Sequence, residues 1–252
     1  MIKFKDVVIK YQDNGNFDLK DLNFTIPKGQ LVGLIGKSGA GKSTILKSFY
    51  DLDTIANGSV IVDDLDIKNL TKNQKRKYKN QIEYVDPDGL NLVNYSTFDN
   101  LKFNYKHYKN FIYKFFKFID KERRDKIWNL AERLQISNLL LAPINKLSSG
   151  QKQRAQLLIS LINEPQILLG DELTSNLDNQ NSHNVMKLLK EFSKDRYTII
   201  AIHDLNLAIQ YCDKLISLKR GKVDKVFIKD EFDKKQIESY FDEPNQVNKI
   251  SK

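Results

Sequence analysis

The stretch that decides the fold of this chain runs from residue 36 to residue 44 and reads Gly36-Lys37-Ser38-Gly39-Ala40-Gly41-Lys42-Ser43-Thr44. It fits the phosphate-binding pattern G-x-x-x-x-G-K-[ST], with an apolar run at 31–35 before it and a helix-like segment at 44–49 after it. Glycines let backbone N–H groups turn toward phosphate oxygens without obstruction by Cβ atoms. A glycine-rich turn is the plainer interpretation, but it does not require Gly, Lys and Ser in this register. The stretch therefore predicts a site for a nucleoside triphosphate.

Two side chains of the stretch have distinct expected roles. Lys42 would reach the β- and γ-phosphates, and the Ser43 hydroxyl would take one coordination position on Mg²⁺. The helix that begins here adds its positive end, equivalent to about half a unit charge. We therefore expect the triphosphate to bind together with Mg²⁺.

Length, charge and cysteine content limit the alternatives. The 252 residues suit one large domain, or a core with a subdomain. The net charge, 41 − 32 = +9, permits contact with nucleic acid or anionic membranes, and the basic residues of 72–79 are expected to form a solvated helix face. Cys212 is the only cysteine, which excludes a disulfide framework. Because residues 1–10 lack the apolar core of a signal peptide and no apolar run approaches the length of a membrane span, we expect a soluble intracellular protein.

The N-terminal part predicts a small antiparallel sheet beside the phosphate-binding core. Residues 2–9 and 19–26 read as strands, with a turn at 13–15 between them. Tyr11 lies just past the first strand, where it would either stack on a nucleotide base or be an ordinary strand-end tyrosine. Its spacing leaves both interpretations open.

Residues 97–160 are almost wholly helical in pattern, which predicts a helical subdomain inserted between two strand-bearing parts. Within it, residues 111–119 mix aromatic residues with lysines. Such a run can stack on single-stranded nucleic acid, lie on a bilayer surface, or form one face of a core helix that completes a partner-docking surface. We expect the core helix.

Two adjacent carboxylates end the short apolar strand predicted at 166–172. A buried parallel strand delivers its last residues to the sheet edge where ligands bind. We expect Asp171 to hold Mg²⁺ through water, and Glu172, pointing the other way, to orient or deprotonate an attacking water. His203 follows another buried strand, at 197–202, and is expected to contact the γ-phosphate.

A further segment reads Leu147-Ser148-Ser149-Gly150-Gln151-Lys152-Gln153-Arg154. Its serines can cap the helix that continues through the apolar positions of 155–162, and a capped helix N-terminus attracts anions. Read alone, the segment predicts only a helix start.

Taken together, the order of these motifs resembles the ATP-binding subunit of an ABC transporter, over about residues 2–228. Residues 36–44 match the family's phosphate loop, 147–151 its LSGGQ signature and 175–178 its SALD-type loop. The long insert after Asn100 is most similar to ATPase subunits of phosphonate-type importers. Because the signature separates this family from other phosphate-loop ATPases, the resemblance is specific.

The resemblance implies an α/β fold with a P-loop NTPase (RecA-like) core, an N-terminal antiparallel β subdomain and an inserted α-helical subdomain. The ATP-binding domain would span 1–228, with the helical subdomain at about 97–160. A charged C-terminal tail at 229–252 would follow, and we expect it to fray.

The resemblance also implies a role for each matched residue. ATP would be bound by the residues Tyr11, Gly36, Lys37, Ser38, Gly39, Ala40, Gly41, Lys42, Ser43 and Thr44. Mg²⁺ would be held by Ser43 and Asp171, and hydrolysis would be carried out by Glu172 and the switch histidine His203. The signature residues are Ser148, Ser149, Gly150 and Gln151. Two chains would meet head to tail as a homodimer that sandwiches two ATP molecules, each closed by Ser148, Gly150 and Asp178 of the other chain.

By the same resemblance, ATP hydrolysis would power import of a phosphonate-type or related anionic solute. The partners would be separate membrane-spanning permease subunits and a solute-binding protein, and the chain would lie peripherally at the cytoplasmic face of the cell membrane. We expect no direct contact with nucleic acid. The alternative is a soluble non-transport member of the superfamily that acts in assembly or on ribosomes or DNA. Ribosome-acting members usually carry two such modules and DNA-repair members carry long coiled-coil inserts, and this sequence has neither.

Two departures from the family pattern bear on the site. Ser149 stands where the signature usually has its first glycine, a mild change if the local φ is negative. The position of the family's magnesium- and water-contacting glutamine falls on Pro87, which has no side-chain donor or acceptor. Our hypothesis is that Asp86 or Asp88 supplies a substitute oxygen ligand.

Overall fold

The computed structural model describes residues 1–10, 18–86 and 93–242, with side chains described as far as residue 238. The strands are β1 (Ile2–Ile9), β2 (Leu19–Ile26), β3 (Leu31–Ile35), β4 (Ile55–Val62), β5 (Leu65–Asp66), β6 (Ile82–Val85), β7 (Ile167–Asp171), β8 (Tyr197–Ala201), β9 (Lys214–Lys219) and β10 (Lys222–Ile228). The helices are α1 (Lys42–Ser48), α2 (Lys72–Asn80), α3 (Thr97–Asn104), α4 (Phe111–Phe116), α5 (Lys121–Arg133), α6 (Ser149–Ile162), α7 (Asn179–Phe192), α8 (Leu205–Tyr211) and α9 (Lys234–Asp242).

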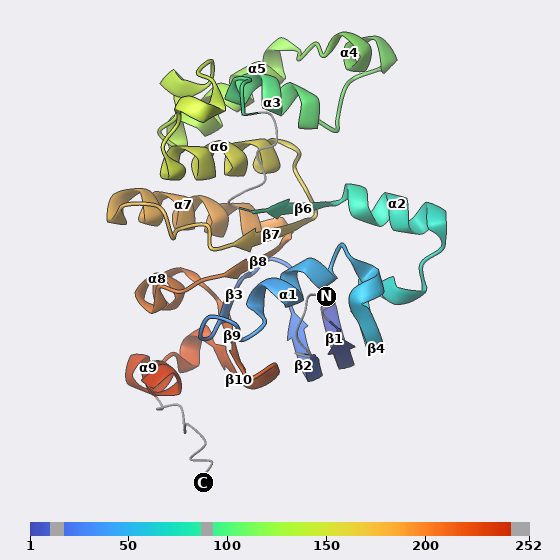
Figure 1. Ribbon diagram of the computed structural model, residues 1–252, viewed down its shortest axis with the longest axis vertical. Coiled ribbons are helices and arrows are strands. Elements are labelled where there is room, and N and C mark those ends of the chain that lie inside the picture. The colour runs from blue at the N-terminus through green and yellow to red at the C-terminus, as the bar shows by residue number, and fades with distance from the viewer. Residues whose placement is uncertain (11–17, 87–92, 243–252) are drawn as a thin grey trace, which may run out of the picture.

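The strands form two sheets (Figure 1). The first is antiparallel, with the order β2-β1-β4-β5, as the N-terminal part of the sequence predicts. The second has the order β10-β9-β3-β8-β7-β6, and its strands run parallel except for the antiparallel β10. The α/β fold is confirmed, with β3, which leads into residues 36–44, in the interior of the second sheet.

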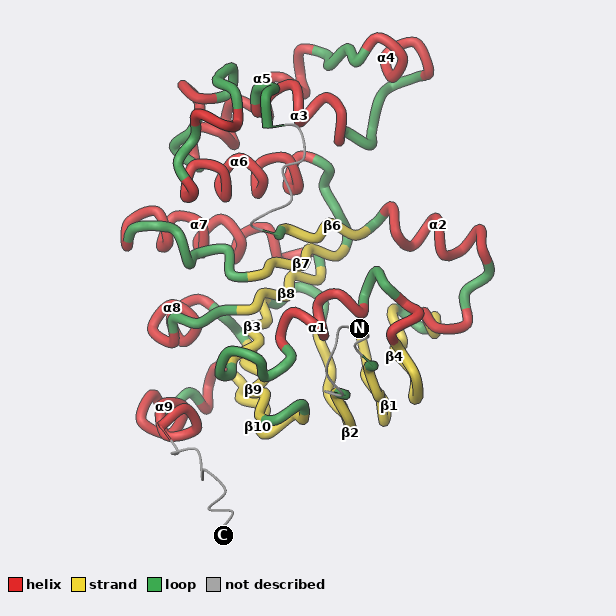
Figure 2. Tube along the Cα trace, viewed as in Figure 1, coloured by secondary structure: helices red, strands yellow, loops and turns green. Residues whose placement is uncertain are grey.

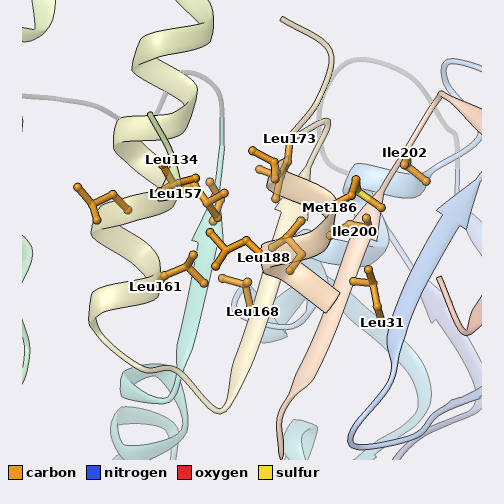
Figure 3. Packing of buried hydrophobic residues seen from close by; sticks show 14 of the residues in the cluster. Leu31, Leu134, Leu157, Leu161, Leu168, Leu173, Met186, Leu188, Ile200 and Ile202 are labelled. Carbon is orange, nitrogen blue, oxygen red and sulfur yellow. The ribbon is translucent and has the colours of Figure 1, made fainter. Parts of the chain in front are cut away.

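The central strands β3, β7 and β8 of the second sheet are apolar on both faces, because both faces are covered. Leu168 and Ile200 point into a core shared with α5 to α8, where they pack near Leu188 (Figure 3). Leu169 and Ile199 point the other way, into a core shared with α1 and the antiparallel sheet. This double burial explains why the strands appear in the sequence as continuous apolar runs.

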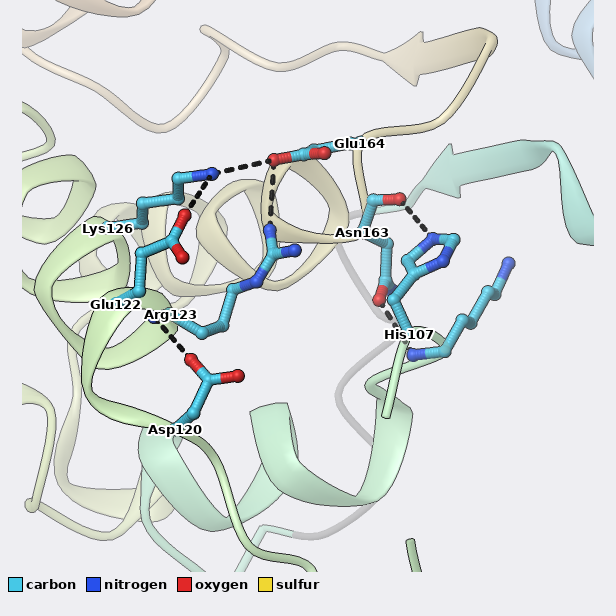
Figure 4. A network of polar contacts seen from close by, with 8 residues as sticks. His107, Asp120, Glu122, Arg123, Lys126, Asn163 and Glu164 are labelled. Carbon is cyan, nitrogen blue, oxygen red and sulfur yellow. Dashed lines mark hydrogen bonds and ion pairs between the residues drawn. The ribbon is translucent and has the colours of Figure 1, made fainter. Parts of the chain in front are cut away.

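Helices α3 to α6 gather at one end of the molecule, beyond α7 (Figure 2). Side chains join them to the second sheet through Asn163, which follows α6 directly. Its Nδ2 donates to Glu83 of β6 at 2.9 Å, and its Oδ1 accepts from the backbone N–H of Lys106 at 3.0 Å. His107 contacts the Asn163 carbonyl oxygen at 2.8 Å, and Arg123 pairs with the neighbouring Glu164 at 2.9 Å (Figure 4). Both ends of the segment 83–107 are therefore tied to the C-terminal end of α6.

Two expectations from the sequence are wrong. The aromatic run at 111–119 is not a face of a core helix, because α4 has six residues, none of them buried, and ends at the left-handed Lys117. A helix that short presents no continuous apolar stripe to a core. The tail does not fray directly after residue 228, because 234–242 form α9 and Ile237 is fully buried in the core beside α8. Among the described helices, none has both the length and the apolar composition needed to cross a membrane.

Candidate nucleotide-binding site

The loop between β3 and α1 has the backbone that its glycines predict. Gly41 is the N-cap of α1 with φ 103°, and a Cβ added there would lie 2.3 Å from Cδ2 of Leu19. Gly39 also has a positive φ, 77°, but an added Cβ would meet nothing within 4 Å. Gly41 is therefore required by both packing and conformation, whereas Gly39 lies beside open space that a ligand can occupy.

The N-terminus of α1 has no side-chain cap and no acidic residue in its first turn. Thr71, Ser96, Ser148 and Asp178 cap other helices by accepting a backbone N–H. The first N–H groups of a helix have no partner within the helix, so those of α1 are left for an external acceptor. An anion fits this position better than a neutral group does.

Lys42 is buried in the loop that it belongs to. Its ammonium donates to the carbonyl oxygens of Gly36 at 2.7 Å and Lys37 at 3.2 Å. Burial lowers the pKa of Lys42, and the carboxylates of Glu172 and Asp171 partly offset this effect. The loop thus carries a positive charge that faces two acids from a distant part of the sequence.

Asp171, the last residue of β7, has two different oxygen environments. Its Oδ2 accepts a hydrogen bond from the Tyr84 hydroxyl at 2.9 Å. Its Oδ1 is buried without any hydrogen-bond partner among the described residues. Burial and the neighbouring Asp171 carboxylate raise the pKa of Tyr84, so the tyrosine remains a donor. An unpartnered buried carboxylate oxygen is costly, and a cation satisfies it.

The backbone of Glu172 is itself left-handed, so the direction of its side chain is not set by the alternation of a strand. The strand ends at Asp171, and Glu172 has φ 51°. Its backbone N–H donates to Ala201 at 3.1 Å, and its carbonyl oxygen accepts from Gln153 Nε2 at 2.6 Å. Its side-chain Oε1 lies 2.7 Å from Nε2 of His203. The two acids and His203 therefore lie at one edge of the sheet, and the contact between Glu172 and His203 was not expected from the sequence.

The signature residues begin α6. Ser148 is the N-cap, and a capping box joins it to Gln151, because each side chain bonds the backbone N–H of the other residue, at 3.3 and 2.9 Å. Ser149 is the first residue of the helix and is not among the positive-φ residues, so its replacement of glycine carries no backbone strain. Both serines are exposed. The predicted capping is confirmed.

The loop 175–178 packs against the start of α6. A Cβ added to Gly150 would lie 2.6 Å from the carbonyl oxygen of Asn176. Asp178 caps α7 by accepting from the Asn181 N–H at 2.8 Å, and Arg154 of α6 donates to the Asn181 side chain at 2.8 Å. In Figure 1, α7 and strands β7 and β8 lie between α6 and α1. The signature and this loop therefore form one unit, which is separate from the phosphate loop within a single chain.

Two contributors to the site were missed from the sequence, and three expected ones lie outside the described residues. Finding Tyr84 from the sequence would require the pairing of β6 with β7, and finding Gln153 would require the orientation of α6. No sequence motif encodes either of these. Tyr11, Pro87 and Asp88 fall at undescribed positions. Asp86 follows β6 directly, and its charge contributes to the raised pKa of Tyr84.

Comparison with known proteins agrees with this geometry. Residues 19–175 match the protein family described as ABC transporter. The phosphonates import ATP-binding protein PhnC of Fusobacterium nucleatum is 33% identical over 88% of this chain and 90% of that protein. PhnC of Lactobacillus acidophilus is 34% identical over 88% and 87%.

Solved structures agree as well. The dimeric structure of MJ0796, a bacterial ABC transporter cassette, is 28% identical, with a TM-score of 0.76, over 92% of this chain and all of that chain. A dimeric post-hydrolysis state of the same cassette, bound to ADP and Pi, gives a TM-score of 0.74 at 28% identity, again over 92% of this chain and all of that chain. The match of sequence, fold and site shows that this chain belongs to the ABC transporter family, as one of its ATP-binding, ATP-hydrolysing subunits.

Proposed function

We propose that this chain powers the import of a phosphonate-type or related anionic solute through separate membrane-spanning subunits. The observation that carries the ATPase part is the convergence of Lys42, Asp171 and Glu172 at the N-terminus of an uncapped helix. Relatives that are named as phosphonate importers support the direction and the class of solute.

In this proposal the phosphate loop binds ATP, and its own groups supply most of the binding. Lys42 turns from the loop carbonyls to the β- and γ-phosphates, and the free N–H groups of α1 donate to phosphate oxygens. Tyr11 stacks on the base. The residues 36–44 thus place the triphosphate with its γ-phosphate toward Glu172.

Ser43 and Asp171 fit Mg²⁺, because the unpartnered Oδ1 of Asp171 needs a cation and Tyr84 fixes the other oxygen. When bound, Mg²⁺ supplies charge neutralisation on the phosphate oxygens. Asp86 is the proposed replacement for the family's glutamine, since it lies close enough to affect Tyr84; Asp88 remains the other candidate.

Glu172 is the proposed general base. It orients the attacking water and accepts its proton, while His203 holds the carboxylate and contacts the γ-phosphate. The Glu172 carboxylate is held by His203, and the left-handed Glu172 backbone is held by Gln153, so the carboxylate keeps one direction. General-base catalysis requires such a fixed direction. Lys42 stabilises the negative charge that develops on the phosphoryl group.

The second half of each site is proposed to come from another copy of the chain. The signature residues Ser148 to Gln151 and Asp178 form a unit on a different part of the molecule from the phosphate loop. The exposed serines at the start of α6 would close on a γ-phosphate already held by the partner's loop. MJ0796 is described as dimeric, which supports this arrangement.

The remaining proposals concern the domains of the chain, its partners and its location in the cell. The ATP-binding domain is proposed to span 1–228, with a helical subdomain at about 97–160 that passes motion to a permease. A solute-binding protein completes the system, and the chain lies peripherally at the cytoplasmic face of the cell membrane. Capture of a polytopic membrane protein with this chain from detergent extracts, and loss of phosphonate uptake when the chain is absent, test the transport part.

Replacing Glu172 tests the chemistry. Glu172→Gln keeps the size of the side chain but removes the base, so hydrolysis should fall at least about a hundredfold while ATP still binds. The variant should elute as a dimer with ATP in size-exclusion chromatography. Glu122→Gln, a change at an exposed acid of α5, is the matched control and should behave as the parent does. Turnover by Glu172→Gln at the parental rate would refute the assignment.

A further inference from the structure

An exposed group of apolar side chains lies on and beside α4. We call Phe111, Ile112, Phe115, Phe116 and Phe118 the aromatic patch; each is between 59% and 78% exposed. Scattered exposed apolar residues are ordinary, but five within eight positions form a contiguous surface that is costly to leave in water. The patch therefore calls for something that covers it.

The aromatic patch is built by its own backbone and ring contacts. Asn110 caps α4 by accepting from the Tyr113 N–H at 3.0 Å, and the N–H of Phe118 bonds back to the Tyr113 carbonyl at 2.9 Å. The rings of Phe115 and Phe116 meet edge to face at 5.1 Å, and those of Phe116 and Phe118 stack at 5.8 Å. The patch is thus a formed surface that needs no folding on contact.

Positive charge surrounds the aromatic patch. Five lysines and no acidic residue lie between Asp99 and Asp120. Lys102 pairs with Asp99 of its own helix and Lys106 pairs with Glu83 of β6, whereas Lys109 and Lys114 are exposed beside the patch. Lys117 lies over the Phe103 ring at 5.5 Å, next to the same surface. What covers the patch is therefore expected to be apolar and negatively charged.

This composition suits a lipid surface better than a protein partner. Phenylalanine, like tyrosine, tryptophan and arginine, is enriched at protein–protein interfaces, but lysine is depleted there, so the lysines beside the patch are what favours lipid. At a bilayer, phenylalanine enters the boundary between headgroups and acyl chains, while lysines extend to anionic headgroups. Each lysine near an anionic surface strengthens binding about fivefold. In Figure 1, α4 stands at the far end of the molecule from α1, so lipid contact leaves the nucleotide site accessible.

We propose that the aromatic patch and the lysines Lys109, Lys114 and Lys117 bind directly to the surface of an anionic bilayer. The contact is independent of the membrane-spanning partners proposed above, and it orients the helices α3 to α6 toward the membrane. It does not depend on ATP hydrolysis. A failure of the lipid test would therefore leave the ATPase assignment unaffected.

Co-sedimentation of the purified 252-residue chain with vesicles tests the proposal. Binding should be strong with about 30% phosphatidylglycerol in phosphatidylcholine, weak with phosphatidylcholine alone, and reduced at about 0.5 M salt. The double variant F115S/F116S should lose at least about tenfold in affinity, because two rings no longer enter the boundary. K109E/K114E should bind about tenfold or more weakly, since four units of charge are changed.

Matched variants separate the patch from general effects. L65S/L141S removes two equally exposed apolar side chains elsewhere, and K77E changes an exposed lysine of α2; both should bind as the parent does. ATPase activity and the thermal midpoint of every variant should stay parental. Equal binding by F115S/F116S and the parent would overturn the proposal. An absence of vesicle binding would overturn the proposal as well. If the parent then bound an oligonucleotide and F115S/F116S bound it more weakly, the patch would be a nucleic-acid surface.

Discussion

The side-chain nitrogen of Gln153 lies 2.6 Å from the carbonyl oxygen of Glu172. This bond joins the first turns of α6 to the left-handed residue that aims the carboxylate at His203. Ser175 Oγ donates to the same carbonyl at 2.9 Å, so two side chains hold the peptide in place. The orientation of α6 and the direction of Glu172 are thereby linked within one chain.

Gln153→Ala should therefore lower kcat for ATP by about tenfold and leave KM nearly unchanged, because the residue positions Glu172 without touching the phosphate loop. Steady-state ATPase kinetics measure both constants. Gln156→Ala is the control, since Gln156 is a buried glutamine of the same helix whose Oε1 has no described partner. Equal losses in kcat for the two variants would mean that only packing was disturbed.

Tyr84→Phe removes the donor that fixes Oδ2 of Asp171. We expect the Mg²⁺ concentration for half-maximal ATPase activity to rise about tenfold, as is typical when a residue that orients a metal ligand is lost. Tyr78→Phe provides the comparison, because the Tyr78 hydroxyl is buried without a described partner. That variant should keep the parental Mg²⁺ dependence, and a shift shared by both would argue against a specific role for Tyr84.

Asp86 and Asp88 can be distinguished by a Mg²⁺ titration of ATPase activity. If Asp86 replaces the family's glutamine, Asp86→Ala should need several-fold more Mg²⁺, and Asp88→Ala should behave as the parent does. The reverse result would assign the role to Asp88. Unchanged Mg²⁺ dependence in both variants would remove the substitute-ligand hypothesis.

Ser149 and Gly150 of the signature should differ in how well they tolerate substitution. Gly150→Ala places a Cβ 2.6 Å from the Asn176 carbonyl oxygen, so α6 must move away from the loop 175–178. We expect at least about a tenfold loss of ATPase activity. Ser149→Gly removes a side chain from a residue without positive φ, and its activity should stay within about twofold of the parent. Equal activity of Gly150→Ala and the parent would contradict the described packing.

The thiol of Cys212 should be inert in the folded chain. It is fully buried, and burial raises its pKa to about 12. The thiolate is the reactive form, so at a pH far below this pKa alkylation by iodoacetamide should be slower than for an exposed thiol by at least about a hundredfold. Mass spectrometry with and without denaturant measures this ratio. Rapid labelling of the native chain would show that α8 opens readily.

Much of the fold was predictable because its central strands are covered on both sides. The runs at 31–35, 167–171 and 197–201 contain almost no polar residues, and the sequence alone marks them as buried. The acids and His203 follow from such strand ends. Hydrophobicity alone gave a wrong prediction for residues 111–119. These aromatic residues lie on the surface and not in the core, since composition does not encode helix length. Hydrophobicity also gave no signal for Ile237, which is buried in the core although it lies in a charged segment.

The backbone conformation that sets the direction of Glu172 was not predicted from the sequence. Strand alternation suggested opposite orientations for the two acids, whereas the structure ends the strand and inserts a left-handed residue. A positive φ at a glutamate has no marker in the sequence, because glycine or asparagine would be its usual signal. The bonds from Gln153 and to Ala201 that hold this conformation come from segments far apart in the chain.

The place of β3 in its sheet has a consequence for biosynthesis. Both of its neighbours, β8 and β9, are encoded more than 160 residues later, so the ribosome has made the glycine loop long before the strands that frame it exist. Contacts this distant along the chain form slowly. A nascent polypeptide halted before residue 197 should therefore fail to retain nucleotide, and ATP added during translation should protect the loop from protease only once β9 has emerged.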